Sequence, residues 1–265
     1  EGVSSWGGAL KVYPDGRNRL PASWSKLQEI LLGTKDIGPE LFEFSSDFSW
    51  QGGVLDISES EFRLGEVKGS AVVSLGPNRV SGRVDLGRLN LDRVLNSELS
   101  VGDEKIAVEL VSKAADLMAS LSNRPSLVAD VILVADAIQY KGEALRNVVV
   151  DAGINDGVIR LNQCSVRLPG ASSLALEGQF YLEQDIPGFL GTAQASSDNL
   201  RALLKWLSVE LDPLSGERLR RLLFSTKIQG TLASGNLTDI DLQLDTSLIR
   251  GGLAYAVSNG RAGLG

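Results

Sequence analysis

The sequence has 265 residues, 43% of them hydrophobic, so the chain is long enough to bury a core as one large domain or two repeated ones. Its formal net charge of −7, with basic residues scattered except at Arg218, Arg220 and Arg221, argues against nucleic acid as a partner. The chain has no histidine and one cysteine, which excludes Ser-His-Asp and Cys-His nucleophiles, an internal disulfide and a compact cysteine zinc site.

The chain begins at Glu1 with no targeting signal, and no apolar run approaches the roughly 18–20 residues that a membrane-spanning helix needs. We therefore expect a soluble piece of a longer protein. An amphipathic helix is expected first, over residues 24–32, where Gly33 ends it.

An internal repeat organises most of the chain. Shifting the sequence by 109 residues aligns Gly69 with Gly178 and Asp130 with Asp239, and upstream a shift of 104 aligns Gly53 with Gly157. The repeat predicts the end of a preceding unit at residues 1–37, repeat units at 38–141 and 142–250, and the start of a third unit at 251–265. Because the units at both ends are incomplete, we expect this sequence to be a part excised from a longer array.

Within each unit the pattern predicts about five strands in a meander. Apolar residues alternate with polar ones over 127–137, 174–182 and 239–245, the period of a half-buried strand. Residues 155–157 suit a tight hairpin, and residues 76–78 suit a β-turn.

Helices are expected between the fourth and fifth strands of each unit. Apolar residues recur at helical spacing over 104–121 in the first unit and 200–207 in the second, and Asp212 with Pro213 is expected to open a second short helix. The predicted fold class is mainly β with some α: an extended, curved antiparallel β-sheet of repeated five-strand units, with short amphipathic helices between units.

The predicted functional surface is the apolar side of the strands. Some ten strands present more apolar area than a few short helices can cover, and such a patch marks a binding surface. Plain core packing, with the face covered by helices or by a second sheet, is the alternative. The residues expected to line a lipid-binding surface are Leu127, Val131, Leu133, Leu174, Leu176, Phe180, Leu182, Ile240, Leu242 and Leu244.

Four segments carry a family resemblance. They are residues 89–95 (LNLDRVL), 137–145 (AIQYKGEAL), 156–161 (DGVIRL) running to 168–170 (LPG), and 199–207 (NLRALLKWL). In this order and at these spacings the chain resembles the AsmA family of bacterial envelope proteins, relatives of TamB among the repeating β-groove, bridge-like lipid-transfer proteins.

The resemblance implies a protein of the Gram-negative periplasm, anchored to the inner membrane through an N-terminal segment that this sequence does not contain. It implies a long curved sheet whose apolar groove serves outer-membrane biogenesis and phospholipid passage. The expected partners are phospholipid acyl chains, further repeats of the same protein and envelope assembly proteins.

Three smaller features have two interpretations each. Asp239, Asp241 and Asp245 could bind a cation, but a solvated outer face is favoured, so no metal is predicted. Cys164 is interpreted as a small buried or edge residue rather than a reactive thiol. Arg218, Arg220 and Arg221, interleaved with Leu219, Leu222 and Leu223, could meet anionic headgroups, but a solvated helix face is favoured.

Three functions are compatible with these features. The preferred one is a non-enzymatic lipid conduit with no catalytic residue and no cofactor. The second is a structural or protein-interaction scaffold whose sheet ends bind by strand addition. An enzyme that cleaves carbohydrate with paired carboxylates is the weakest.

Overall fold

The described part of the chain is dominated by a single β-sheet. The computed structural model describes residues 5–12, 42–64, 66–92, 126–183, 186–209, 218–231, 233–258 and 261–264. Their strands are β1 (Ser5–Val12), β2 (Phe42–Gln51), β3 (Val54–Leu64), β4 (Val67–Leu75), β5 (Arg79–Asn90), β6 (Val128–Tyr140), β7 (Glu143–Asn155), β8 (Val158–Leu168), β9 (Ser172–Glu183), β10 (Ile186–Ser197), β11 (Leu222–Thr231), β12 (Ser234–Leu244), β13 (Ser247–Ser258) and β14 (Arg261–Leu264), with helix α4 (Leu200–Trp206) between β10 and β11.

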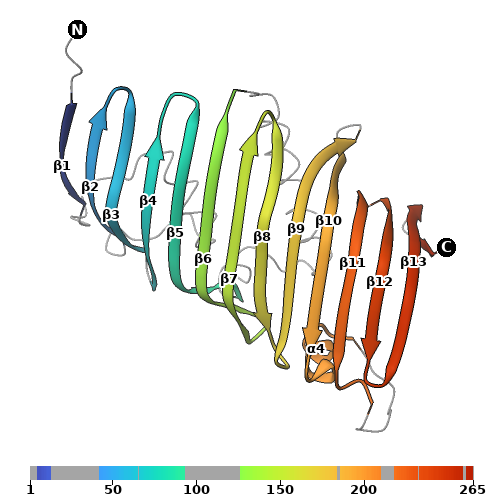
Figure 1. Ribbon diagram of the computed structural model, residues 1–265. Helices are drawn as coiled ribbons and strands as arrows, with labels where there is room; N and C mark the ends of the chain where they lie inside the picture. The colour runs from blue at the N-terminus through green and yellow to red at the C-terminus, as the bar shows by residue number, and fades with distance from the viewer. Residues whose placement is uncertain are drawn as a thin grey trace.

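The strands lie side by side in chain order, from β1 to β14, in one open and curved sheet (Figure 1). Each strand pairs with its neighbours in the sequence, and the hairpin predicted at residues 155–157 joins β7 to β8 through Asp156 and Gly157, with φ of 51° and 73°. The predicted β-turn at residues 76–78 joins β4 to β5, where the Gly76 N–H donates to the Arg79 carbonyl at 2.7 Å. The expected curved, mainly antiparallel sheet is confirmed.

The strand arrangement departs from the expected meander in two places. β5 and β6 run parallel, which requires a crossover of a dozen or more residues between Asn90 and Val128. Residues 142–250 contain one strand more than expected, because β11 lies between β10 and β12 and pairs with both of them. The helices predicted at 24–32, at 104–121 and after Asp212 lie outside the described residues. The division into repeat units remains a prediction.

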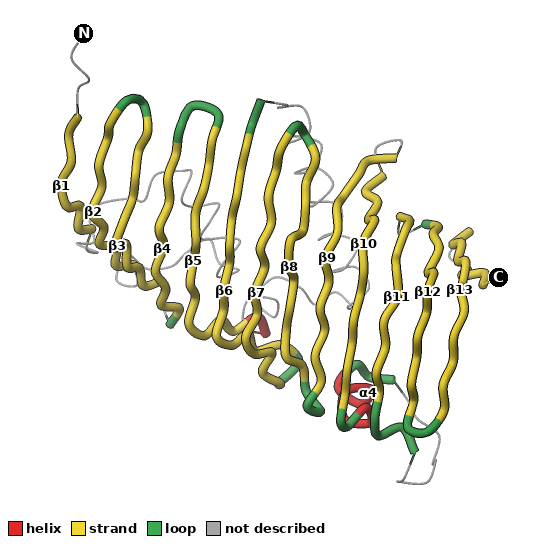
Figure 2. Tube along the Cα trace, viewed as in Figure 1, coloured by secondary structure: helices red, strands yellow, loops and turns green. Residues whose placement is uncertain are grey.

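Helix α4 confirms the helix expected at residues 200–207. It lies where the strands end on one side of the sheet. Figure 2 shows it beside the ends of β10 and β11. The Asn199 side chain caps it by accepting from the Ala202 N–H at 3.2 Å. Leu200 is buried, and the Trp206 indole N–H donates to the Tyr140 carbonyl at 3.2 Å. The helix thus connects the end of β10 with the last residue of β6, Tyr140.

Bulges bend the sheet, and buried hydroxyl groups lie at two of them. The pairing slips between Ile57 and Ser60 on β3, with Ser46 of β2 opposite, and between Leu237 and Ile240 on β12, with Thr226 of β11 opposite. Ser60 and Thr226 each donate to a carbonyl of the facing strand, at Ala71 and Thr238. Because a bulge removes one ladder hydrogen bond, these hydroxyls satisfy backbone groups that would otherwise be buried without a partner.

The bulge hydroxyls can be tested at Thr226, which is 4% exposed and donates to the Thr238 carbonyl at 2.9 Å. Thr226→Val keeps the side-chain shape but leaves that carbonyl unpaired, so we expect a loss of about 1–3 kcal/mol in the free energy of unfolding. Urea denaturation followed by circular dichroism measures it. Thr238→Val at an exposed position is the matched control, with an expected change within about 0.5 kcal/mol. Equal effects of the two substitutions would contradict the role of the hydroxyl.

Candidate lipid-binding face

Cross-strand pairing assembles apolar side chains into rows that run across the sheet. Directly paired residues on neighbouring strands lie on the same face, as do alternate residues along one strand. One row runs from β2 to β13 through Trp50, Leu55, Leu75, Val80, Ala129, Ile154, Ile159, Phe180, Phe189, Gly230, Gly235 and Tyr255. The next runs through Phe48, Ile57, Val73, Gly82, Val131, Ala152, Leu161, Gly178, Gly191, Ile228, Leu237 and Leu253.

Two further rows complete this surface, which we call the apolar face. The third contains Ser60, Ala71, Val84, Leu133, Val150, Cys164, Leu176, Ala193 and Thr226, and the fourth, on β8 to β13, contains Val166, Leu174, Ala195, Phe224, Leu242 and Ile249. None of the residues in these four rows carries a charge.

The residues predicted to line a lipid surface fall on this one face. Val131, Leu133, Leu174, Leu176, Phe180 and Leu242 are members of the four rows. By strand alternation Leu182, Ile240 and Leu244 lie on the same face, where they pair with Pro187, Gly251 and Ser247. Leu127 directly precedes β6 and is half-buried. The structure therefore brings the predicted positions together; their contact with lipid remains a prediction.

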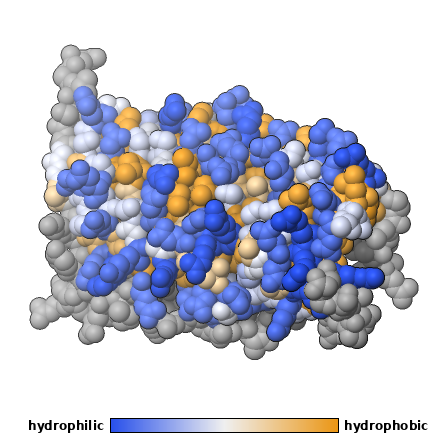
Figure 3. Space-filling model, turned by 60° about the horizontal axis from the view of Figure 1, so that its bottom comes forward, coloured by the Kyte–Doolittle hydropathy of each residue, from blue (hydrophilic) through white to orange (hydrophobic). Residues whose placement is uncertain are grey.

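Charged and polar side chains are on the opposite face. Arg63 pairs with Glu43, Arg83 with Asp85, and Arg250 with Asp241, all on exposed side chains. Figure 3 shows apolar residues in patches among hydrophilic ones on the visible side of the molecule. The sheet is thus amphipathic across its width, with scattered exposed apolar residues such as Val72 and Leu190 on the charged side.

Little of the apolar face is packed into a core by described residues. The large apolar side chains that are buried among the described residues are Val67, Leu86, Leu161 and Leu200. A small cluster of Val67, Leu86 and Ala135 gathers side chains such as Phe62 and Leu133 around it. By contrast Val131 is 40% exposed and Ile249 is 53% exposed on the same face. Among the described residues, the face thus has a small packed region, and most of its other side chains are half-buried.

Aromatic rings cover three glycines of this face. At Gly69 the ring of Phe62 occupies the space that a Cβ would need, and at Gly178 and Gly191 the ring of Phe189 does the same. Phe189 also contacts Phe180, with ring centroids 5.2 Å apart. A side chain at Gly191 would collide with the facing backbone as well. Glycine is required here because ring and backbone approach too closely for any Cβ.

Cys164 lies half-buried in the third row, as the sequence led us to expect. Burial raises the pKa of its thiol, which keeps the sulfur protonated and less nucleophilic. It stands at a bulge between Leu161 and Cys164, and the equivalent bulge on β3 lies between Ile57 and Ser60. The thiol is thus a small side chain at a bulge position.

The three aspartates considered as a cation site each make a separate contact. Asp239 sits at a bulge with φ of 52° and pairs with Lys227 at 2.7 Å, while Asp241 pairs with Arg250. Asp245 lies in the turn after β12. No cluster of potential metal ligands occurs within the described residues.

The helix face expected around Arg218, Arg220 and Arg221 is wrong. These residues form an irregular approach to β11, which begins at Leu222. The Asp245 carboxylate accepts hydrogen bonds from the backbone N–H groups of Leu219, Arg220 and Arg221 at 2.7, 2.9 and 2.9 Å. No sequence pattern signals this contact, because Asp245 is more than twenty residues away along the chain and binds backbone atoms.

No helix in the described part of the chain has the length and apolar character needed to cross a membrane. In comparisons with protein-family models, curated proteins and solved structures, nothing matches this chain. The resemblance to the AsmA family therefore rests on the four sequence segments at 89–95, 137–145, 156–170 and 199–207.

Asp245 gives a pH-dependent test of the segment before β11. The N–H of Arg221, helped by those of Arg220 and Leu219, lowers the pKa of this carboxyl below its ordinary value of 3.8. A lowered folded-state pKa means that ionised Asp245 stabilises the fold above pH 3.8, and that this contribution is lost as the pH falls through the folded-state pKa. In Asp245→Asn we expect a Tm deficit that is largest at neutral pH and shrinks in acid.

The matched control is Asp156→Asn, which removes the same charge from another turn residue with φ of 51°. Differential scanning fluorimetry between neutral pH and pH 3 compares the variants with the unmodified chain. Parallel Tm profiles for Asp245→Asn and the unmodified chain would contradict a stabilising contact between this carboxylate and the backbone before β11.

Proposed function

We propose that this chain is a non-enzymatic segment of an AsmA-like periplasmic protein that offers an apolar β-groove to phospholipid acyl chains passing between the inner and outer membranes. The observation that supports the proposal is the apolar face: four uncharged rows of side chains that continue across the strands while ion pairs occupy the other side. Contact with acyl chains would bury this surface without covalent chemistry.

The dimensions of the face suit acyl chains. From Leu174 to Phe180 the four rows span seven residues of β9, or about 20 Å along the strand. A bilayer core is about 30 Å thick and contains two layers of chains, so one chain layer is about 15 Å. Across the strands, the rows from β2 to β13 extend for about 50 Å at the usual strand spacing. The face is wide enough for one layer of acyl chains and much longer than a single lipid.

The side-chain chemistry favours a fluid hydrocarbon as the occupant. Most of the central positions are Val, Leu, Ile or Ala, and the exposed ones include Val131 and Ile249. A protein partner would be expected to bring polar groups that need hydrogen-bond partners, whereas the four rows offer few side-chain donors or acceptors. An acyl chain requires none, so uniform apolar contact favours the lipid.

A scaffold function is the second candidate, supported by the end of the sheet. β13 pairs with β14 only from Tyr255 to Ser258, so within the described residues its segment from Ser247 to Ala254 has no strand on that side. Unpaired strand edges accept a further strand from another chain or another part of the same protein. A native mass spectrum of the purified chain would separate the two candidate functions. A mass that includes bound lipid favours the conduit, and a lipid-free mass favours the scaffold.

Charged substitutions on the apolar face test the conduit. We expect the triple variant Val131→Glu, Leu182→Glu, Leu242→Glu to lose at least about nine-tenths of the phospholipid that co-purifies with the unmodified chain, because buried carboxylates are costly beside acyl chains. Lipid extracts measured by mass spectrometry give the amount. Val131 is chosen over Leu133 because Leu133 packs against the core cluster and its replacement would disturb folding.

The chain offers a matched control on the opposite face. Val72, Leu190 and Leu223 are 58%, 42% and 49% exposed, and changing all three to Glu adds the same charge away from the apolar face. This variant should retain its phospholipid, and both variants should keep the β-sheet circular dichroism spectrum. Equal lipid recovery from both triple variants would reject the apolar face as the lipid site.

A further inference from the structure

Three strands carry a bulge at the same height of the sheet. The strands β3, β8 and β12 each slip against both of their neighbours, at Glu59, at Asn162 and at Asp239. Each slip lies one or two residues beyond a second-row residue of the apolar face. Because a bulge interrupts the ladder of backbone hydrogen bonds, the three bulges mark a line across the sheet along which the ladder is weakened.

The backbone at this line is exposed and partly strained. At each bulge two consecutive polar side chains face water: Ser58 and Glu59, Asn162 and Gln163, and Thr238 and Asp239. Glu59 and Asp239 have φ of 49° and 52°, in the left-handed region that residues other than glycine rarely adopt. Backbone strain of this kind is found at ligand clamps and at switch regions of proteins. Two of the three bulges therefore contain a strained residue that no packing covers.

Two buried hydroxyl groups beside the line each have two carbonyl acceptors. The Thr226 hydroxyl lies 2.9 Å from the Thr238 carbonyl of the facing strand and 3.2 Å from the carbonyl that follows it on its own strand. The Ser46 hydroxyl lies 3.4 Å from the Ser58 carbonyl of its facing strand and 3.0 Å from the carbonyl that follows it. A hydroxyl has one proton to donate, so each group keeps a hydrogen bond whichever acceptor it uses. The nearer acceptor is across the strands at Thr226 and along the strand at Ser46, so both arrangements occur in this sheet.

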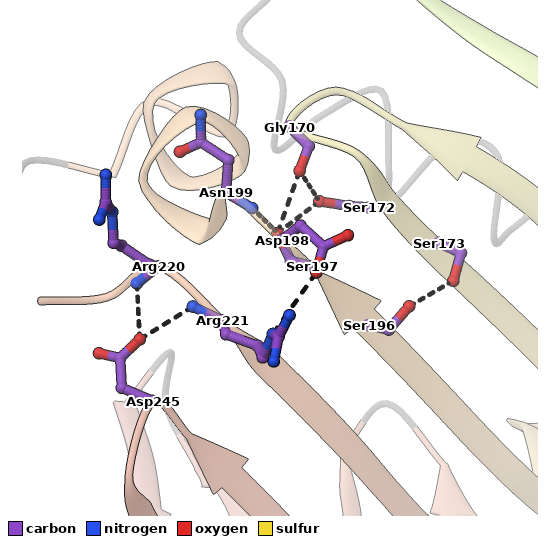
Figure 4. Close-up of polar contacts among 10 residues, drawn as sticks. All are labelled: Gly170, Ser172, Ser173, Ser196, Ser197, Asp198, Asn199, Arg220, Arg221 and Asp245. Carbon is purple, nitrogen blue, oxygen red and sulfur yellow. Dashed lines mark hydrogen bonds and ion pairs between the residues drawn. The ribbon is translucent and has the colours of Figure 1, made fainter.

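On one side of the line, side-chain contacts hold the strand ends together. The Ser172 hydroxyl of β9 donates to the Ser197 hydroxyl of β10 at 2.8 Å, and both groups are buried. The Asp245 carboxylate accepts the backbone N–H groups of Arg220 and Arg221 and so holds the turn after β12 against the start of β11 (Figure 4). These contacts join four neighbouring strands into one unit.

On the other side of the line, aromatic rings have the same role. The rings of Phe180 and Phe189 join β9 to β10 in the first row, with centroids 5.2 Å apart. The Tyr255 hydroxyl of β13 donates to the Thr231 carbonyl at the end of β11, and the Thr231 hydroxyl accepts the Ser234 N–H of β12 at 3.3 Å. The sheet therefore has two firmly held parts with the line of bulges between them.

We propose that the line of bulges is a hinge along which the sheet bends, so that the angle between the two halves of the apolar face changes. Hinges in proteins are short stretches whose backbone angles change while the elements on either side keep their structure. The purpose of the bending rests on the proposed function, because a sheet that closes along this line would enclose acyl chains that lie on the apolar face.

Pulsed electron paramagnetic resonance measures the bending, in a chain that carries Cys164→Ser. One pair of spin labels, at Asn236 and Gln243, lies on exposed positions of β12 and crosses the line. The control pair, at Arg167 and Gln243, lies on one side of it, in a row of paired residues from β8 to β12. Strand geometry places the labelled residues of both pairs about 20 Å apart. We expect the distance distribution of the crossing pair to be at least about twofold wider than that of the control pair.

A deletion of Asp239 removes the hinge from β12. It leaves Leu237 and Ile240 two positions apart, so the apolar residues on both sides of the deletion stay on the same face. The distribution of the crossing pair should narrow to the width of the control pair. Equal widths for the two pairs in the chain with Asp239 present would overturn the hinge. If the deletion variant loses its β-sheet circular dichroism spectrum, the comparison of the two pairs decides alone.

Added phospholipid separates the hinge from the conduit. Vesicles of phosphatidylglycerol should narrow the distance distribution of the crossing pair and leave that of the control pair unchanged. If the lipid binds and the crossing pair does not respond, the closing of the sheet around lipid is overturned. If no phospholipid binds, the conduit fails, while the widths of the two pairs without lipid still decide whether the sheet bends along this line.

Discussion

The two-sided character of the sheet depends on register. Side chains alternate from face to face along a strand, so a slip of one residue would move every apolar side chain of that strand to the charged side. The described strands keep register through several bulges, and each bulge moves one residue out of the alternation. Ser60 and Thr226 lie beside two of these bulges, and the hydroxyl of each donates to a carbonyl of the facing strand. The apolar rows continue on both sides, so a bent sheet retains one uncharged face.

Strand periodicity made this face predictable from the sequence. Leu174, Leu176, Phe180 and Leu182 alternate with more polar residues, and pairing to β8 and β10 places them all on one side as expected. The same holds for Val131 and Leu133 on β6. The tight turn at Asp156 and Gly157 was equally readable, because few residue types accept the positive φ values that such a turn requires. Local patterns were sufficient for these features.

The features that the sequence did not reveal depend on distant contacts. Leu219, Leu222 and Leu223 have the spacing of a helical face, yet the structure starts a strand at Leu222. Pairing of this segment with both β10 and β12 outweighs its local preference. The parallel pairing of β5 with β6 was missed for a similar reason, since chain direction depends on the long connection between them. The contact of the Asp245 carboxylate with the backbone N–H groups of Arg220 and Arg221 was missed because these residues are more than twenty positions apart in the sequence.

In an open amphipathic sheet of this length, part of the apolar surface stays exposed to water, whereas a closed sandwich buries it between two sheets. Apolar surface contributes roughly 25 cal/mol per Å² when it leaves water, so side chains such as Val131 and Ile249 forgo part of that stabilisation while they stay exposed. The sheet is held instead by its continuous ladder of backbone hydrogen bonds and by the small cluster around Leu86 and Ala135. The more exposed side chains of the apolar face would therefore gain free energy on contact with an occupant. A fluid hydrocarbon can supply that gain at any point along the rows because no charge on the face favours one place over another.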